Sequence, residues 1–396
     1  MSSTRIGVAI VGCGAIGQVH TAIASGLDSI EIVAVVDAVG AATARLADKL
    51  AREGFRRPQE CESLEVALAL HEVDLVVLTT PSGLHIDQAN AALDARRHVI
   101  IEKPLDVNLV RARALTDRAQ MVKDHGLVVS VISQHRFDTA SRLIAQALAS
   151  QAFGRITSAI ASTAWWRPQS YYDSAPWRGT WQMDGGGALM NQSVHNVDLL
   201  LSFMGHPTEV SGHTALLAHE RIQVEDSATA TISFESGAVA AVHATTAAYP
   251  GLSTRLQLMG TLGSAVIEDD ELAYYHAAAK AGTNVGPMGL RVAQGNHAAE
   301  ILATTAEPEY RLGLPLPAAT DAGQYRLDPA SHHRQYQDVV RAIQTGEAPQ
   351  VTIQDAFNAL ALVQSVYISA TLHRPILFDD VLAGRHDHVD TRTLGA

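Results

Sequence analysis

The sequence predicts an α/β protein with two domains: a doubly wound parallel sheet, followed by an α/β domain whose large open sheet is mostly antiparallel. Two observations predict this. Apolar runs of strand length alternate with segments of helical spacing up to residue 134, and strands that alternate with helices form parallel sheets. From 208 to 268, short alternating strands follow one another, which is typical of an antiparallel sheet.

The elements of the first domain begin with a βαβ unit. Ile6 to Val11 is an apolar run that ends at glycine, residues 15–27 have helical spacing, and Ile30 to Val36 is a second apolar run. The same alternation then continues. The further strands are expected at 73–79, 98–102 and 127–133, and the further helices at 40–53, 85–95 and 107–124.

The second domain is expected at 135–380, with a loose tail at 381–396. All four tryptophans lie in one loop between residues 165 and 181. Residues 277–328 are rich in Ala, Gly and Pro and allow no assignment. The expected strands lie at 156–160, 227–234, 238–244, 256–259 and 264–268, and the expected helices at 139–150, 188–203, 331–345 and 354–372.

Composition and charge exclude several classes of function. A chain of 396 residues is long enough for two cores, and a net charge of -12 disfavours binding to nucleic acid or to an anionic membrane. No apolar run reaches the roughly 18 residues that span a membrane. The N-terminus lacks the features of a signal peptide, and Cys13 and Cys61 are interpreted as reduced thiols, so we expect a cytoplasmic protein.

The segment Gly12-Cys13-Gly14-Ala15-Ile16-Gly17 has the spacing G-x-G-x-x-G directly between a strand and a helix. In this context the first glycine allows the tight turn, the second lets the main chain approach a pyrophosphate, and the third lets the helix pack on the strand. Asp37 ends the next strand, where an acid accepts both ribose hydroxyls of NAD and repels the 2′-phosphate of NADP. We predict an NAD site. The alternative is a structural glycine turn beside an exposed aspartate.

Thr79-Thr80-Pro81 follows another strand of the same sheet, at the edge where ligands bind in this topology. The threonine hydroxyls are predicted to contact the ribose or nicotinamide side of the cofactor. The alternative is a plain polar turn. His85 begins the next helix, where it is either a ligand contact or a histidine of the helix start.

Glu102-Lys103-Pro104 follows the apolar strand that contains Val99 to Ile101. A lysine delivered to the ligand edge of a sheet is costly to bury unless it is paired or functional. Its ammonium can hydrogen-bond a reacting oxygen and stabilise developing alkoxide charge. The alternative is a surface lysine at the end of a strand.

The third polar segment follows Gly185-Gly186-Gly187, which would allow close approach of the main chain to a flat ligand. Asn191, His195 and Asp198 then share one face of a predicted helix. A histidine among polar neighbours can move a hydroxyl proton, and the alternative is a satisfied interior histidine. The tryptophans are either core or a stacking surface for a sugar ring, and Trp166 is the candidate for stacking. No His-x-x-x-His or Cys-x-x-Cys spacing occurs, so no metal site is expected.

Taken together, these motifs resemble the Gfo/Idh/MocA oxidoreductases, the group of glucose-fructose oxidoreductase and inositol dehydrogenase. The resemblance covers about residues 5–378 and includes Trp177-Arg178 and His332-x-x-Gln335-x-x-Asp338 in family order. It implies a Rossmann domain followed by an α/β domain whose open sheet often mediates a homodimer or homotetramer. It also implies hydride transfer between NAD(P) and a secondary hydroxyl, usually on a sugar or cyclitol ring.

The same resemblance implies roles for single residues. Lys103 is the catalytic lysine, Pro104 follows a cis peptide, and His195 matches the acid/base histidine. Trp177-Arg178 resembles the pair near the nicotinamide and substrate, and Gln134 and Arg136 match a segment that borders the substrate pocket. Glu102 and Gln134 are counted with the cofactor-binding residues, and Arg136 with the substrate-binding residues.

One position departs from the inositol dehydrogenase pattern, which has Asp where this sequence has Asn191. An amide cannot stabilise an imidazolium by charge, so either His195 is less basic or Lys103 carries more of the proton transfer. Met190-Asn191-Gln192 resembles a branch that acts on sugar nucleotides, which moves the expected substrate away from inositol. The alternatives are a dihydrodiol or other non-sugar alcohol, and a non-catalytic dinucleotide-binding regulator.

Overall fold

The computed structural model describes residues 5–278, 290, 292–306, 310–316 and 329–392. The chain divides into two compact units: Met1–Gln134 with Glu309–Phe357, and His135–Pro308 with Asn358–Ala396. The described residues 310–316 and 329–357 therefore belong to the first unit, whereas the sequence placed them in the second domain. Most of the stretch that resisted assignment at 277–328 lies outside the described residues.

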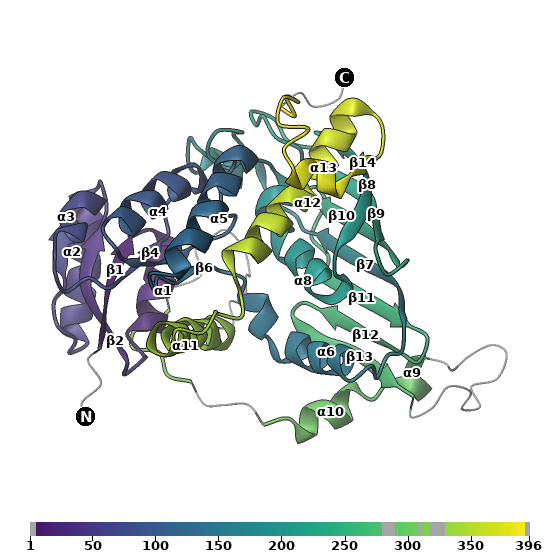
Figure 1. Ribbon diagram of the computed structural model, residues 1–396, viewed down its shortest axis with the longest axis horizontal. Coiled ribbons are helices and arrows are strands. Elements are labelled where there is room, and N and C mark those ends of the chain that lie inside the picture. The colour runs from purple at the N-terminus through teal and green to yellow at the C-terminus, as the bar shows by residue number, and fades with distance from the viewer. Residues whose placement is uncertain (1–4, 279–289, 291, 307–309, 317–328, 393–396) are drawn as a thin grey trace. The chain divides into compact units, whose positions relative to one another are not determined.

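The first unit is built on a six-stranded sheet with the order β3-β2-β1-β4-β5-β6, in which every pair is parallel (Figure 1). This order is that of the doubly wound dinucleotide-binding fold, so the predicted parallel sheet is confirmed. The strand β3 was not predicted, because its three residues include no apolar run. The strands are β1 Ile6–Val11, β2 Ile30–Val36, β3 Gln59–Cys61, β4 Leu75–Leu78, β5 His98–Ile101 and β6 Val129–Val131.

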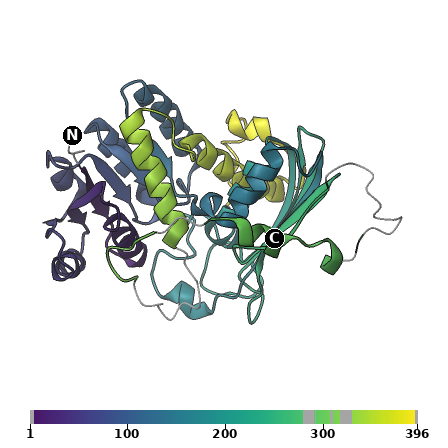
Figure 2. The same cartoon turned by 90° about the horizontal axis from the view of Figure 1, so that it is seen from below.

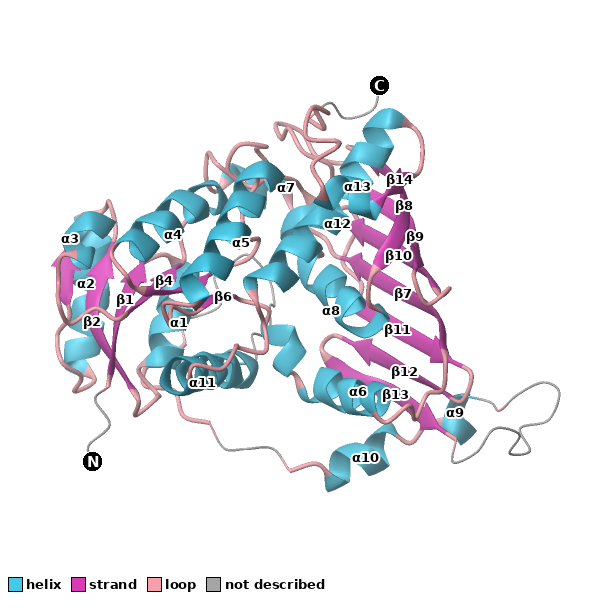
Figure 3. Ribbon diagram, in the orientation of Figure 1, coloured by secondary structure: helices cyan, strands magenta, loops and turns pink. Residues whose placement is uncertain are grey.

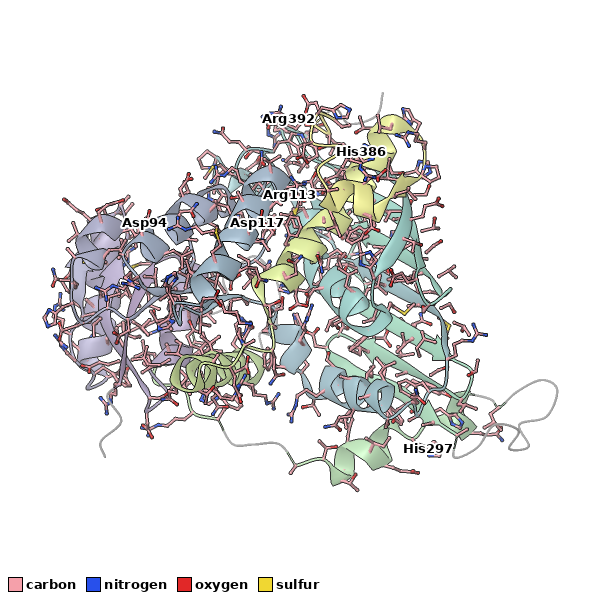
Figure 4. The ribbon with its side chains drawn as sticks, in the orientation of Figure 1. Asp94, Arg113, Asp117, His297, His386 and Arg392 are labelled. Atoms are coloured by element: carbon pink, nitrogen blue, oxygen red, sulfur yellow. The ribbon has the colours of Figure 1, made fainter. Side chains whose placement is uncertain are left out.

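Helices connect these strands, as the sequence predicted for all but the short α3. Asp94 of α4 and Arg113 and Asp117 of α5 are labelled in Figure 4. The helices of this unit are α1 Ala15–Ala24, α2 Gly40–Arg52, α3 Leu64–Leu68, α4 His85–Asp94, α5 Leu109–Lys123 and α11 Pro329–Thr345, with a 3₁₀ turn η1 at Ser82–Leu84.

Helix α11 joins the first unit because its apolar face packs in the core of the parallel sheet. Tyr336, Val339 and Val340 are buried in the same cluster as Ile10 and Ile23 of β1 and α1. An apolar helix face in the sequence does not say which sheet it covers. The assignment of α11 to the second domain was wrong for this reason.

The second unit is built on an eight-stranded sheet with the order β13-β12-β11-β7-β10-β9-β8-β14, drawn in magenta in Figure 3. All pairs are antiparallel except β7 with β10, which are parallel. The predicted mostly antiparallel sheet is therefore confirmed. The strands are β7 Ile156–Ala164, β8 Pro207–Ala215, β9 Ser227–Phe234, β10 Val239–Thr245, β11 Thr254–Gly260, β12 Gly263–Glu268, β13 Glu271–Ala277 and β14 Ile376–Leu377.

Helices α6 and α8 lie along this sheet, as Figure 2 shows from below. The helix expected at 188–203 is interrupted: residues 188–192 form a π-helical turn and α8 begins after Ser193. Helix α12 is shared between the two units, and its last fifteen residues belong to this one. The helical elements of the second unit are η2 Gln134–Phe137, α6 Thr139–Ala149, α7 Gln169–Asp173, η3 Ala188–Gln192, α8 Val194–Met204, α9 Val292–Gly295, α10 Ala298–Thr304, α12 Ile353–Leu372 and α13 Phe378–Leu382.

The C-terminal residues differ from the loose tail that was expected at 381–396. Val381 is buried, and main-chain hydrogen bonds link Gly384 to Val381 and Val389 to His386. His386 and Arg392 of this segment are labelled in Figure 4. Residues 393–396 of the expected tail lie outside the described residues. Among the described helices, none is long and apolar enough to cross a membrane.

Candidate active site

The glycine loop lies at the carboxyl end of β1 and is held from two sides. The amide of Gly12 donates to the carbonyl of Val36 over 2.8 Å, and the hydroxyl of Thr79 lies 2.8 Å from the carbonyl oxygen of Gly12. Gly12 has φ +98°, and a side-chain carbon there would lie 2.8 Å from the carbonyl oxygen of Thr79. Both observations explain why this position requires glycine.

The other two glycines of the motif are required for different reasons. A side-chain carbon at Gly17 would lie 1.9 Å from the carbonyl oxygen of Gly12, so this glycine allows α1 to pack against the loop. A side-chain carbon at Gly14 would meet no protein atom within 4 Å. Open space at the second glycine, beside the N-terminal amides of α1, is what a dinucleotide pyrophosphate needs. The residues present therefore fit an NAD cofactor, with Ala15 and Ile16 forming the first turn of α1.

Asp37 lies directly after β2 and accepts two main-chain hydrogen bonds. Its Oδ2 accepts from the amide of Cys13 over 2.8 Å, which joins it to the glycine loop, and its Oδ1 accepts from the amide of Val39 over 2.8 Å. Each carboxylate oxygen has a further lone pair, so Asp37 is able to accept two ribose hydroxyls as well. Asp37 is half-buried, which leaves it accessible to a ligand.

The Thr79-Thr80-Pro81 segment follows β4, but its side chains have partners within the protein. Thr79 is buried against the glycine loop, and the hydroxyl of Thr80 donates to Gln88 over 2.6 Å. The contacts of Thr79 and Thr80 support the loop itself, which the sequence did not predict. Pro81 precedes the 3₁₀ turn η1.

His85 is completely enclosed and faces main-chain carbonyls. Its Nδ1 lies 2.9 Å from the carbonyl oxygen of Pro104, and its Nε2 lies 2.9 Å from that of Thr80. Burial lowers the pKa of His85, so the neutral ring donates to one of these carbonyls at a time. The sequence counted His85 with the cofactor contacts, whereas the structure places it between the segments that follow β4 and β5.

Lys103 follows β5 at the same edge of the sheet and is half-buried. The peptide between Lys103 and Pro104 is cis, as the resemblance implied. The preceding residue, Glu102, is buried, and its Oε2 accepts the amide of Lys103 over 2.9 Å. The carboxylate therefore fixes the main chain from which the lysine projects.

Glu102 is held in turn by His20, which is itself held by Tyr336 from a distant part of the first unit. Its Oε1 lies 2.7 Å from Nε2 of His20 on α1, and Nδ1 of His20 lies 2.8 Å from the hydroxyl of Tyr336 on α11. Burial raises the pKa of Glu102, but the hydrogen bond and charge of His20, with Lys103 and His332, outweigh burial and lower it to about 2. Glu102 is therefore a charged buried anchor behind Lys103, and its side chain points to His20.

The segment that the resemblance placed at the pocket border forms the 3₁₀ turn η2. Gln134, the last residue of the first unit's N-terminal part, is buried. In the second unit, Nε and Nη2 of Arg136 donate to the two carboxylate oxygens of Asp198 over 2.7 and 2.6 Å. This bidentate pair fastens η2 to α8, the helix that carries His195.

His195 lies on the first turn of α8, and the ring of His135 approaches it edge to face with 4.8 Å between centroids. His135 itself lies 2.7 Å from Asp138 and 3.3 Å from Asp270. Asn191 lies on η3, and its Nδ2 donates to Asp184 over 2.5 Å. Asp198 is paired with Arg136, so the three polar residues that were expected on one helix face have three different partners.

The triple glycine has a different role from the one predicted. A side-chain carbon at Gly187 would lie 1.7 Å from the carbonyl oxygen of Glu225, and one at Gly186 would lie 2.2 Å from the hydroxyl of Tyr367. Gly186 and Gly187 approach protein atoms, not open space. The expectation that they approach a flat ligand is corrected: they allow η3 to pack against the residues before β9 and against α12.

The tryptophan-rich loop, residues 165–181, is a cluster of aromatic rings and arginines. Trp166 packs against Tyr249 and His219, with centroid distances of 5.3 and 5.8 Å. The guanidinium of Arg178 lies 4.7 Å from the centroid of Trp177. Trp166 and Trp177 are both half-buried, so each retains accessible ring surface.

Two groups of side chains have the composition of metal ligands: His20 with Glu102 and His332, and His135 with Asp138 and Asp270. In each group one histidine nitrogen lies 2.7 Å from a carboxylate oxygen, in the pairs His20–Glu102 and His135–Asp138.

The strand order of the parallel sheet and the glycine loop together identify the first unit as the NAD-binding domain of an oxidoreductase. A model of the oxidoreductase family with an NAD-binding Rossmann fold matches residues 6–133, and a model of the GFO/IDH/MocA C-terminal domain matches residues 141–266. The two matches cover more than half of the chain. The protein belongs to the GFO/IDH/MocA family of oxidoreductases.

Individual relatives are similar over most of their length. The NAD(+)-dependent scyllo-inositol 2-dehydrogenase of Bacillus subtilis is 28% identical over 269 residues, which cover 66% of this chain and 74% of that enzyme. The 1,5-anhydro-D-fructose reductase of Ensifer adhaerens is 30% identical over 208 residues, 52% of this chain and 60% of that enzyme. The crystal structure of the WlbA dehydrogenase from Bordetella pertussis, in complex with NADH and UDP-GlcNAcA, is 28% identical with a TM-score of 0.75, and the match covers 95% of this chain and 99% of that one.

The sequence did not indicate the buried residues that form hydrogen bonds to the candidate site and to the segment before α8. His20 was assigned only to a helix, Tyr336 carried no prediction, and Glu225 lies in a segment without a motif. A histidine three residues after the last glycine of the loop was the one local signal for His20. Nothing local pointed to Tyr336 or Glu225, whose partners are distant in the sequence.

Proposed function

We propose that this protein is an NAD-dependent dehydrogenase that oxidises a secondary hydroxyl of a sugar, sugar derivative or cyclitol to a ketone. The observation that carries the proposal is the position of Lys103. It follows β5, and the glycine loop follows β1, with β4 alone between these strands. Since neighbouring strands are about 4.8 Å apart, the two strand ends lie about 10 Å apart at one edge of the sheet.

NAD bound at the glycine loop supplies the acceptor for the hydride that leaves the carbinol carbon. The ammonium of Lys103 hydrogen-bonds the hydroxyl oxygen and stabilises the alkoxide charge that develops there. His195 accepts the hydroxyl proton, with Asn191 as a polar neighbour on η3. Asp37 binds the adenosine ribose and disfavours NADP. Two relatives support the sugar and cyclitol classes: WlbA is in complex with UDP-GlcNAcA, and the Bacillus enzyme is named for scyllo-inositol.

The test is NAD reduction, followed by absorbance, across matched sugars, cyclitols, glycosides and nucleotide sugars. With the best substrate, Lys103→Met should lower kcat at least about 1000-fold while the Kd of NADH changes little. His195→Gln should lower kcat roughly 100-fold and flatten its pH profile. Lys123→Met, which removes an exposed lysine at the end of α5, is the control and should leave both quantities unchanged.

Near wild-type turnover by Lys103→Met would refute the role of the lysine, and the absence of NAD reduction with every compound would refute the dehydrogenase.

We also propose a homo-oligomer, either a dimer or a tetramer. Alternate residues of β10 are exposed, among them Val239 at 53%, and Ile160 of the neighbouring β7 is exposed at 41%. Exposed apolar residues on an open sheet favour pairing with a second copy. The mass of the protein in solution tests this proposal, and a monomer at micromolar concentration would contradict it.

A further inference from the structure

Two arginines of the tryptophan-rich loop lie over the same tyrosine ring. The guanidinium carbon of Arg167 is 5.2 Å from the centroid of Tyr171, and that of Arg178 is 4.3 Å from it. Each guanidinium also lies over a tryptophan, Arg167 at 4.9 Å from Trp165 and Arg178 at 4.7 Å from Trp177. Two positive charges are therefore held between aromatic faces within one short loop.

Neither guanidinium has a carboxylate partner within the part of the chain that the structure describes. Other arginines of this unit are paired, such as Arg136 with Asp198 and Arg221 with Asp173. The Nε atoms of Arg167 and Arg178 are buried and have no hydrogen-bond partner among the described residues. Arg142 and Arg155 of this unit also have no ion pair among the described residues, but neither lies over an aromatic ring there, so the two stacked cations are distinguished by their aromatic enclosure.

The arginines are connected to the segment that precedes His195. Nη2 of Arg167 donates to Oε1 of Gln192 over 3.0 Å. Nε2 of Gln192 donates to the hydroxyl of Tyr171 over 3.2 Å and to Oδ1 of Asn191 over 3.1 Å. The amides of η3 therefore fix Tyr171 and Arg167 relative to the start of α8, on which the proposed proton acceptor lies.

We infer that Arg167 and Arg178 bind an anionic group carried by the substrate, so that the substrate is a sugar with a carboxylate or phosphate group. The inference rests on the proposed function, because it names the substrate class of the same site. A guanidinium presents a planar fork of N–H donors that matches both oxyanions. Aromatic faces exclude water from its sides and restrict its rotamers, which strengthens an ion pair and lowers the entropy lost on binding.

The other possible source of the same anion is the diphosphate of the dinucleotide. Arg167→Met is the variant that distinguishes the sources, because Arg178 is already a candidate cofactor contact. Arg155→Met is the matched control: Arg155 is exposed and precedes β7, whereas Arg167 follows it. A strand of this length separates the two arginines by about 30 Å.

Binding is measured by quenching of tryptophan fluorescence, and turnover by NAD reduction. The probes are pairs that differ only in charge: glucuronate with glucose, galacturonate with galactose, and glucose 6-phosphate with glucose. We expect at least one anionic sugar to bind roughly 10- to 100-fold more tightly than its neutral partner. Arg167→Met should remove that difference, Arg167→Lys should retain part of it, and Arg155→Met should retain all of it.

Circular dichroism establishes that Arg167→Met is folded. If Arg167→Met instead weakens NADH binding and leaves sugar affinity unchanged, the anion is the cofactor's and the inference is wrong. Equal affinity for the members of every pair also overturns it. Turnover that favours neutral sugars would refute this inference but support the proposed dehydrogenase activity. Tight binding of an anionic sugar without turnover of any compound would support the inference but refute the dehydrogenase activity.

Discussion

Two glycine-rich segments of this protein look alike in sequence and do opposite things. At Gly14 of the first segment, a side-chain carbon would meet nothing within 4 Å. At Gly187 of the second segment, it would lie 1.7 Å from a main-chain oxygen of Glu225. The first glycine keeps space open for a ligand, and the second allows two pieces of protein to touch.

The carboxylates beside the two segments differ in the same way. Asp37 accepts the amide of Cys13 but is half-buried, so it is accessible to a ligand. Glu225 is fully buried and accepts hydrogen bonds of 2.9 Å from the amides of Gly187 and Leu189 and from the hydroxyl of Tyr367. The comparison teaches that a glycine run predicts close approach of the main chain, but not what approaches it.

The largest effect is expected from Gly187→Ala, which would break the second segment. The added methyl group conflicts with the main-chain carbonyl of Glu225, which cannot rotate away as a side chain could. We expect the free energy of unfolding to fall by at least about 3 kcal/mol. Urea denaturation measures the change, and a midpoint equal to that of the wild type would show that the segment is not packed as described.

A smaller loss is expected from Glu225→Gln. The amide of glutamine has one oxygen and one NH₂ group, so a donor would face one of the N–H or O–H groups that Glu225 accepts. We expect a loss of about 1–3 kcal/mol in the free energy of unfolding. Glu220→Gln, at an exposed residue in the same loop, is the control and should change the stability little. Equal stability of both variants would contradict the role of Glu225.

The pH dependence of stability sharpens the comparison further. Burial raises the pKa of Glu225 to about 7, although hydrogen bonds from Leu189, Gly187 and Tyr367 oppose the rise. Because the pKa of Glu225 is raised on folding, the protonated side chain contributes to the free energy of unfolding. This contribution is fully present below about pH 4.5 and is lost as the pH rises through about 7. Between pH 6 and 8, the wild type should lose about 1 kcal/mol more stability than Glu225→Gln. Parallel losses in both proteins would rule out titration of Glu225.

The smallest effect on stability is expected from Gly14→Ala, in the open segment. With no atom near the added methyl group, the free energy of unfolding should change by less than about 0.5 kcal/mol. NADH affinity should nevertheless fall at least about 10-fold, because the methyl group occupies the space of the pyrophosphate.

Gly126→Ala is the cross-control for Gly14→Ala. Gly126 precedes β6 and has φ +77°, so alanine there should cost about 1 kcal/mol of stability without an effect on NADH binding. A large loss of stability in Gly14→Ala would mean that Gly14 is a structural glycine like Gly187.

Much of the first unit could be predicted because its signals are local. The strand β1, the glycine loop and α1 follow one another within 19 residues, from Ile6 to Ala24, and each has its own period or turn residue. The parallel pairing of β7 with β10 could not be predicted, because β8 and β9 intervene in the chain and the alternation of a strand does not record its direction.

The candidate site was predicted in pieces. Lys103, Asp37 and His195 each follow or begin an element whose position the sequence indicates. The sequence left two interpretations of His85 open, because nothing in it shows that Pro104 supplies a carbonyl to the ring. Arg167 was overlooked because only the structure shows that it lies over Trp165 and Tyr171. The structure also shows no carboxylate partner for it among the described residues.

By itself, the sequence determined the order of the elements, the glycine loop and the identity of the residues at the ends of the strands, since these depend on neighbours within a few positions. Only the tertiary structure decided which distant residues form hydrogen bonds with these segments. His20 meets Tyr336 across 316 positions of the chain, and Glu225 meets Gly187 across 38. Such pairs form because burial of the apolar faces of α1, α11 and α12 brings distant polar groups together, and once enclosed those groups must satisfy one another.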